Sequence, residues 1–229
     1  MTIFITIEGN IGSGKSTLLM HLKHFFNKEN INVGYIDEPV AEWDQIKDSH
    51  GTTILSKYYA DQKQYAFAFQ MMAYISRLVK MQKVLELNYD VVIMERTMIT
   101  DKEVFAKMLY DEGKLQDIEY QIYNMWFDAF IGNIPELYYI YVKTTPVVAS
   151  NRVQLRNRTG ESIPIDYLIK CNEYHDKWLN QIPRDKILTI NSNQYFDSEQ
   201  YDYVCELVYE FISSHLSTKR VFNACYDMC

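Results

Sequence analysis

The residues from Gly9 to Ser16 read GNIGSGKS, which matches the pattern G-x-x-x-x-G-K-S of a phosphate-binding loop. The glycines let the backbone curl so that several N–H groups point at one anion, and Lys15 adds a positive charge. The Ser16 hydroxyl offers a ligand to Mg²⁺, and the N-terminus of a following helix also attracts phosphate. An apolar β-branched run before the loop and helical spacing after it argue against the alternative, a glycine turn with an incidental lysine. The loop therefore predicts binding of a nucleoside triphosphate, and we expect the contacts to come from Gly9, Asn10, Ile11, Gly12, Ser13, Gly14, Lys15, Ser16 and Thr17.

Charged residues that suit phosphoryl transfer follow two other short apolar runs. Glu38 comes directly after residues 33–37 and before Pro39, which pushes it into an extended conformation. Its carboxylate is placed where an acceptor hydroxyl could give up its proton, although a surface cap is the alternative. Glu95 and Arg96 follow residues 90–94, where phosphate-loop proteins keep the acid that orients Mg²⁺. An arginine there can neutralise charge on the transferred group, and a salt-bridged strand end is the alternative.

Three arginines lie within seven residues of each other in an otherwise acidic protein: Arg152, Arg156 and Arg158. On a helix, Arg152 and Arg156 share a face and could close over an anion. A solvated basic face is the alternative. Together with a phosphate loop, the cluster favours an arginine lid that supplies positive charge to an anionic transition state.

The elements that must position these residues alternate along the chain. Short apolar and β-branched runs predict five strands, at residues 2–7, 33–37, 90–94, 137–142 and 187–190. Helical spacing predicts a helix behind Lys15, a long helix within 54–87, and further helices at about 101–111, 115–131, 146–158, 165–179 and 198–216. This alternation predicts an α/β fold with a central parallel sheet covered by helices on both faces. Ligands of such sheets bind at the carboxyl ends of the strands, where Gly9, Glu38 and Glu95 are expected to meet.

Composition limits the remaining possibilities. The chain has 229 residues, 48% of them hydrophobic, so we expect a single domain over residues 1–229, with a mobile tail at 217–229. A net charge of −7 argues against nucleic acid as a partner. The N-terminal apolar run spans only six residues, and no stretch approaches the roughly 18 of a membrane span, so we expect a cytoplasmic protein without a membrane partner. The four cysteines form no C-x-x-C pair and are expected to be free thiols: Cys171, Cys205, Cys225 and Cys229.

Four sequence segments resemble one known family. They are Glu38-Pro-Val-Ala-Glu-Trp43, Phe67-Ala-Phe-Gln70, Glu95-Arg96 with Asp101 five positions after the arginine, and Arg152-x-x-x-Arg156-x-Arg158 before Ile163-Pro164. In this order they resemble the deoxynucleoside kinases of the deoxycytidine, deoxyguanosine and deoxyadenosine kinase type, over nearly the whole chain. The resemblance implies a P-loop kinase fold with a five-stranded parallel sheet, ATP with Mg²⁺ as donor, a deoxynucleoside 5′-hydroxyl as acceptor, and a homodimer packed through helices.

The resemblance also implies roles for individual residues. Glu38 would be the general base, Arg96 would position the 5′-oxygen and phosphate, Ser16 and Glu95 would hold Mg²⁺, and a lid over about 146–163 would carry the three arginines. Around the nucleoside, Gln70 would bind the base edge, Trp43 and Phe69 would line the base pocket, and Tyr59 with Glu161 would hold the 3′-hydroxyl. Asn191 to Phe196 falls where the family's loop brackets the adenine of ATP.

The chain departs from the family pattern in two places. The turn between Arg158 and Pro164 is one residue shorter than in animal members, which makes Glu161 a weaker match, and Asn191 stands where an acid is often found. No transit peptide precedes the loop, which argues against an organellar form. Two alternatives remain: a thymidylate-kinase-like nucleoside monophosphate kinase, and a non-catalytic kinase-like structural subunit such as the accessory subunit of mitochondrial complex I.

One helical face predicts the base preference. Gln70, Ala73 and Arg77 lie at i, i+3 and i+7, so they face one pocket. A buried Arg77 must be paired, and Asp101 would neutralise it and aim its donors at the base. Members of the resembled family that favour thymidine tend to have apolar residues at the two positions where this chain has Ala73 and Arg77. We therefore expect deoxyadenosine, deoxyguanosine or deoxycytidine to be preferred over thymidine.

Overall fold

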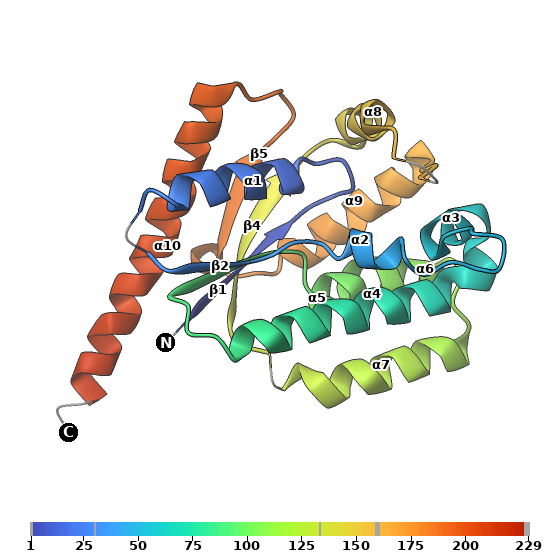
Figure 1. The fold of residues 1–229 in the computed structure, drawn as a ribbon, viewed down its shortest axis with the longest axis horizontal. Helices are drawn as coiled ribbons and strands as arrows, with labels where there is room; N and C mark the ends of the chain where they lie inside the picture. Colours follow the sequence, from blue (N-terminus) through green and yellow to red (C-terminus); the bar gives the residue numbers. More distant parts are fainter. Residues whose placement is uncertain (1, 30, 133, 159–160, 227–229) are drawn as a thin grey trace.

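Five strands form one parallel sheet at the centre of the computed structural model (Figure 1), which describes residues 2–29, 31–132, 134–158 and 161–226, with side chains up to 216. The strands are β1 (Ile3–Glu8), β2 (Val33–Ile36), β3 (Val91–Glu95), β4 (Leu137–Lys143) and β5 (Ile187–Asn191). Their order is β2-β3-β1-β4-β5, and every neighbouring pair is parallel. The predicted strands are confirmed to within one residue at each end.

Two helices cover one face of the sheet. They are α1 (Lys15–Phe26) and α10 (Ser198–Tyr226), which contact each other (Figure 1). Alternate residues of β1, namely Ile3, Ile5 and Ile7, point to this side and pack with them in one core. Alternation at a period of two explains how a strand that is buried along its whole length serves two cores. The last helix is longer than expected: it continues past residue 216 to Tyr226, and residues 227–229 of the tail expected to be mobile lie outside the described part.

The other face carries the larger core, built around α4 (Gln62–Leu85), α7 (Asp117–Ile131) and α9 (Ile165–Leu179). Phe4 of β1 and Met94 of β3 point into it. The sheet is thus covered on both faces, as predicted. None of the described helices is both long enough and apolar enough to cross a lipid bilayer.

Shorter elements complete the chain: α2 (Val40–Trp43), α3 (Ile54–Ala60), α5 (Met98–Thr100), the π-helical η1 (Asp101–Ala106), α6 (Lys107–Asp111), α8 (Pro146–Arg156) and the 3₁₀ turn η2 (Arg184–Lys186). Asp61 separates α3 from α4, because its side chain accepts the N–H of Gln64 and caps the longer helix. The expected helix through Arg158 ends earlier, at Arg156. Asn157 adopts left-handed backbone with φ 46°, which ends α8.

The strand order puts the predicted site residues at one edge. β1 lies between β3 and β4, and β2 lies on the far side of β3. The loop after β1, Glu38 two residues after β2, and Glu95 at the end of β3 therefore meet above the carboxyl ends of the strands.

Candidate active site

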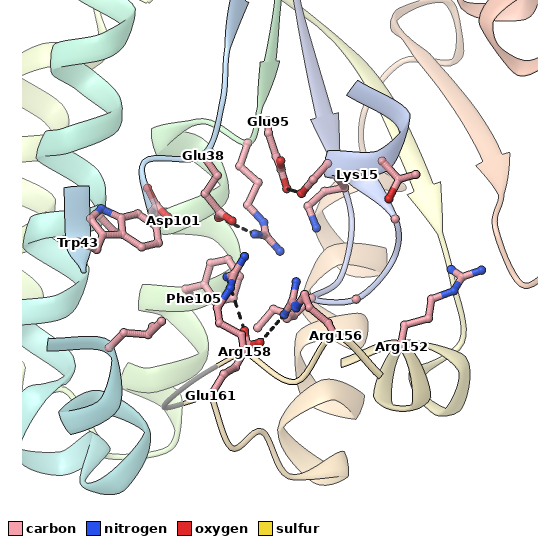
Figure 2. A pocket seen from close by; sticks show the side chains of 18 of the residues that line it. Lys15, Glu38, Trp43, Glu95, Asp101, Phe105, Arg152, Arg156, Arg158 and Glu161 are labelled. Carbon is pink, nitrogen blue, oxygen red and sulfur yellow. Dashed lines mark hydrogen bonds and ion pairs between the residues drawn. The ribbon is translucent and has the colours of Figure 1, made fainter. Parts of the chain in front are cut away.

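A cavity of about 580 Å³ opens at this edge of the sheet (Figure 2). It brings together most of the residues that the sequence predicted, from the phosphate loop, the strand ends, α4, η1 and the lid. The predicted residues that line it are Ile11, Gly12, Gly14, Lys15, Ser16, Thr17, Glu38, Trp43, Tyr59, Phe69, Gln70, Ala73, Arg77, Glu95, Arg96, Asp101, Arg152, Arg156, Arg158, Glu161 and Phe196. Gly9, Asn10 and Ser13 belong to the phosphate loop but do not line the cavity, and neither does Asn191.

The phosphate loop has the curled backbone that its glycines predicted. Gly12 has φ 79°, and a Cβ there would lie 2.4 Å from the carbonyl oxygen of Ala149 in α8, so only glycine fits between the loop and the lid helix. Lys15 is buried and donates to the Asn10 carbonyl over 2.7 Å. Burial and the charge of Arg96 lower the pKa of Lys15 to about 7, against the pull of nearby carboxylates. A bound phosphate would compensate this buried amine.

Ser16 and Glu95 meet where the resemblance implies a metal. The Ser16 hydroxyl donates to Glu95 Oε1 over 3.0 Å, and Glu95 is buried. The described residues contain no group of three or more histidine, cysteine, aspartate or glutamate side chains that could hold a metal ion. One hydroxyl and one carboxylate nevertheless suit Mg²⁺, which keeps several waters and completes its shell with substrate phosphates.

Glu38 is held by two arginines. Its Oε1 accepts hydrogen bonds from Arg77 Nη2 over 2.7 Å and from Arg96 Nη1 over 2.8 Å. Burial favours the protonated acid, but the charges of Arg96, Arg77 and Lys15 outweigh it and lower the pKa of Glu38 to about 2. The carboxylate is therefore ionised at neutral pH, and neither hydrogen bond uses its Oε2.

Arg96 has an unusual backbone for a residue with a side chain. Its φ is 60°, in the left-handed region, which costs on the order of 1 kcal/mol or more and persists only where the surroundings impose it. The guanidinium is buried, donates from Nη2 to the Gly9 carbonyl over 3.1 Å, and lies 5.2 Å from the ring centre of Phe105. Arg96 thus contacts both the phosphate loop and Glu38.

The predicted base pocket is lined by aromatic rings. Trp43 and Phe69 meet nearly edge to face with ring centres 5.5 Å apart, and Tyr58 stacks on Phe69 at 4.4 Å. Gln70 of α4 is buried, and within the described structure its Oε1 has no hydrogen-bond partner. A buried carbonyl without a partner at the wall of a cavity is suited to a ligand donor. Ala73 adds a small buried side chain to the lining.

Arg77 and Asp101 form the polar corner of this pocket. Their Nε and Oδ2 atoms are 3.5 Å apart, and both side chains are buried. Burial raises the pKa of Asp101 to about 6, against the charges of Arg77 and Arg96. Arg77 Nη1 and Asp101 Oδ2 lack hydrogen-bond partners among the described residues, so this corner can still bind a ligand.

The three arginines of the predicted lid contact different partners. Arg156 Nη2 lies 2.5 Å from Glu161 Oε2, and Arg158 Nη1 lies 3.9 Å from Glu161 Oε1, with the carboxylate only 4% exposed. Arg152 lies apart from this pair (Figure 2) and donates to the Ser13 carbonyl, the Ser192 hydroxyl and the Gln194 carbonyl. Arg152 and Arg156 were expected to act together on one anion, but they contact different groups. Arg152 links the phosphate loop to the loop after β5, and Arg156 contacts Glu161.

Tyr59 and the loop after β5 complete the lining. Burial raises the pKa of Tyr59 well above its usual value, and Tyr59 and Glu161 both line the cavity. Phe196 lines the cavity, but Asn191 lies at a second, smaller cavity and accepts the backbone N–H of Asn193 over 3.1 Å.

Sequence reasoning missed five residues of the lining: Leu55, Tyr58, Phe105, Tyr167 and Tyr201. A signal existed for Phe105, which lies four positions after Asp101 on the same helical segment. None existed for the hydrogen bond of 2.8 Å between the hydroxyls of Tyr58 and Tyr167, which are far apart in the chain.

Comparison with known proteins points to one enzyme family. The family model described as "Deoxynucleoside kinase" matches residues 5–213. The chain is 33% identical to the fowlpox virus protein named "Probable deoxycytidine kinase", over 91% of this chain and 88% of that protein. It is 30% identical to human deoxycytidine kinase, over 92% and 91% respectively, and 29% identical to deoxycytidine kinase 1 of Xenopus laevis, over 92% and 90%. The chain therefore belongs to the deoxynucleoside kinase family and is an enzyme that phosphorylates deoxynucleosides.

Proposed function

We propose that this enzyme transfers the γ-phosphoryl group of ATP to the 5′-hydroxyl of a deoxynucleoside and so serves deoxynucleoside salvage. The observation that carries the proposal is the carboxylate of Glu38, kept ionised by two arginines in the same cavity as the phosphate loop. A phosphate loop alone fits many nucleotide-binding proteins. A partly buried carboxylate base beside it fits an alcohol as the second substrate.

In the proposed reaction, the 5′-oxygen attacks the γ-phosphorus, the bond from phosphorus to the ADP oxygen breaks, and the hydroxyl proton goes to Glu38. Arg96 donates hydrogen bonds where negative charge develops, and Lys15 holds the donor phosphates. Arg156 and Arg158 supply charge from the lid, and Arg152 fixes the phosphate loop against the loop around the adenine. The deoxynucleoside would occupy the side of the cavity lined by α4.

Ser16 and Glu95 are the residues that would hold Mg²⁺. The ion would neutralise charge on the donor phosphates. The chain's own contribution is a hydroxyl at the start of α1 and a carboxylate at the end of β3, already 3.0 Å apart.

The base pocket supports a preference for deoxyadenosine, deoxyguanosine or deoxycytidine over thymidine. Arg77 and Asp101 form a charged corner that would meet the methyl group of thymine, and a polar site that is left unsatisfied discriminates strongly. The relatives named deoxycytidine kinase support a substrate from this group.

We also propose a homodimer of single-domain chains in the cytoplasm. The contacting helices α4 and α7 expose the apolar side chains Ile75, Val79, Met125 and Trp126, which fits a packed helical interface. Cys171 and Cys205 are buried free thiols, which fits a reducing compartment.

An assay of ATP turnover with the four deoxynucleosides and their monophosphates tests the proposal. The expected products are ADP and a deoxynucleoside 5′-monophosphate. Phosphorylation of monophosphates alone would support a thymidylate-kinase-like enzyme, and no turnover with any acceptor would support a structural subunit.

A further inference from the structure

Glu8, the last residue of β1, is a fully buried carboxyl group that the proposed reaction does not use. Its Oε1 accepts hydrogen bonds from Thr6 Oγ1 over 2.6 Å and from Thr100 Oγ1 over 2.7 Å, and its Oε2 lies 2.8 Å from the same Thr100 oxygen. Both partners are hydroxyl groups and not arginine or lysine. A carboxyl group is costly to bury, so its place between a strand and a helix start calls for a physical explanation.

Thr100 connects Glu8 to the turn that carries Arg96. While its hydroxyl donates to Glu8, it accepts the backbone N–H of Thr97 over 3.1 Å. A hydroxyl has one proton, so donation to Glu8 turns its lone pairs toward Thr97. Thr97 directly follows Arg96, whose φ of 60° is the strained backbone at this strand end. Glu8 therefore fixes the hydroxyl that holds the far side of the Arg96 turn.

The two neighbours of Glu8 contact Arg96 directly. The Ile7 carbonyl accepts the backbone N–H of Arg96 over 3.2 Å, and the Gly9 carbonyl accepts from its Nη2 over 3.1 Å. Ile7, Glu8 and Gly9 thus each hold a different part of this turn. Ile7 binds the backbone N–H of Arg96, Gly9 binds its guanidinium, and Glu8 acts through Thr100 on the N–H of the next residue. Left-handed backbone at a residue with a side chain persists only when the surroundings over-determine it, and the end of β1 does so here.

We propose that Glu8 is a positioning residue for phosphoryl transfer, which acts through Thr100 and Thr97 to hold the strained turn of Arg96 and so aims its guanidinium at Glu38. This inference rests on the role proposed above for Arg96. We call the two hydrogen bonds from Thr97 to Thr100 and from Thr100 to Glu8 the bridge. Without the bridge the backbone turn at Arg96 relaxes, and a displacement of about 1 Å in a catalytic group costs on the order of a hundredfold in rate. The loss should fall on kcat and not on nucleoside KM, because Gln70 and Arg77, which line the proposed base pocket, come from α4.

A matched pair of variants tests the bridge. Thr100→Val and Thr6→Val each remove a fully buried hydroxyl that donates to Glu8 Oε1, and valine keeps the volume in both. Only Thr100 contacts the Arg96 turn. Thr100→Val should lower kcat by on the order of ten- to a hundredfold with nucleoside KM nearly unchanged, while Thr6→Val keeps nearly normal kcat. Equal losses in the two variants, or none in Thr100→Val, would overturn the proposal.

The background of Arg96→Met gives a second readout that a purely structural role would not move. If Thr100 acts through Arg96, then Thr100→Val should lower kcat far less in this background than in the wild type. A full additional loss would overturn the proposal, since Thr100 would then act on another group. Near-normal kcat in Arg96→Met alone would instead contradict the proposed role of Arg96, so the two failures are distinguishable.

Two conservative variants, together with one truncation, keep the test decisive if Thr100→Val does not fold. Thr100→Ser retains the hydroxyl and should restore nearly full kcat. Glu8→Gln retains an oxygen that can accept from Thr100, whereas Glu8→Ala does not. The glutamine variant should keep most of kcat while the alanine variant loses it, and equal kcat in these two folded variants would overturn the proposal.

Discussion

Glu38 accepts a hydrogen bond from Arg96 over 2.8 Å, and the two residues follow the adjacent strands β2 and β3. The same guanidinium donates to the carbonyl of Gly9 in the phosphate loop. The pair therefore connects the side of the cavity that would hold the acceptor with the side that would hold the donor. An ionised base beside a fixed cation is arranged to receive a hydroxyl proton while its oxygen attacks phosphorus.

Replacement of Arg96 should separate its charge from its geometry. Arg96→Met should lower kcat by on the order of a hundred- to a thousandfold, because it removes donors at the transferred group. Arg96→Lys restores the charge but not the planar fork that contacts Glu38 and Gly9 together, so it should recover only part of the loss. Steady-state kinetics with deoxynucleoside and ATP measure both. Full activity in the lysine variant would show that charge alone suffices.

Protonation of Glu8 should appear in the pH dependence of stability. Burial raises its pKa from the ordinary 4.5 to about 7, against hydrogen bonds from Thr6 and Thr100 and the charges of Arg96 and Lys15. Between these values the folded protein retains a proton that the unfolded chain has released, so the contribution of Glu8 to the free energy of unfolding falls as pH rises from 4.5 to about 7. Glu8→Gln does not titrate.

The free energy of unfolding of Glu8→Gln relative to the wild type should therefore rise across this range and level off above it. Urea denaturation of both proteins at a series of pH values gives the difference, in which other titrating groups such as Asp101 and His175 largely cancel. A difference that does not vary with pH would contradict the raised pKa.

The sugar site should favour deoxyribose over ribose. Glu161, fixed by Arg156 and Arg158 and lining the same cavity as Tyr59, would clamp the 3′-hydroxyl and leave little room beside C2′. Adenosine and cytidine should therefore have lower kcat/KM than their deoxy counterparts. Glu161→Gln should raise nucleoside KM, with Glu173→Gln on α9 as a control for the loss of one carboxylate. Equal kcat/KM for ribo and deoxy substrates, or an unchanged KM in Glu161→Gln, would remove this clamp from the account.

The pocket corner of Arg77 and Asp101 should reject thymidine. Removing both charges and filling the space at Ala73, in the combined variant Ala73→Val, Arg77→Met, Asp101→Ala, should raise kcat/KM for thymidine relative to the other three deoxynucleosides. A charged corner that thymine leaves unsatisfied should discriminate against thymidine by about 3 kcal/mol, and the triple variant removes this corner.

Arg77 also contacts Glu38 over 2.7 Å, so the absolute kcat of the triple variant should fall, and the ratio between substrates is the informative quantity. A wild type that prefers thymidine, or a folded triple variant without a relative gain for thymidine, would show that these three residues do not select the base.

Much of the fold follows from local sequence. Each strand is a short apolar run, and α9 begins and ends at the predicted Ile165 and Leu179, with Pro164 marking its start. A parallel sheet then brings the loop after β1, Glu38 and Glu95 to one edge whatever the details of the helices. The break at Asp61 also had a local signal, since Asp61 and Gln64 have the spacing of a helix N-cap.

The rest depends on contacts between distant segments, which a single sequence does not display. The Tyr58 and Tyr167 hydroxyls meet across 109 residues, and Thr100 reaches Glu8 across 92. The left-handed backbone of Arg96 has no signature of its own, because glycine or asparagine is the usual residue in that region. Such a conformation is imposed by the surrounding strands, and only the assembled sheet shows it.

The most direct test of the account is single-turnover phosphoryl transfer by the wild type and by Glu38→Gln, followed with ATP labelled in its γ-phosphate and deoxyadenosine or deoxycytidine as acceptor. Glutamine can still accept hydrogen bonds from Arg77 and Arg96, so nucleoside binding should persist while the rate of 5′-monophosphate formation falls by on the order of a hundred- to ten-thousandfold. Formation of the 5′-monophosphate at a near-normal rate by Glu38→Gln would contradict the central claim that this carboxylate receives the proton of the 5′-hydroxyl.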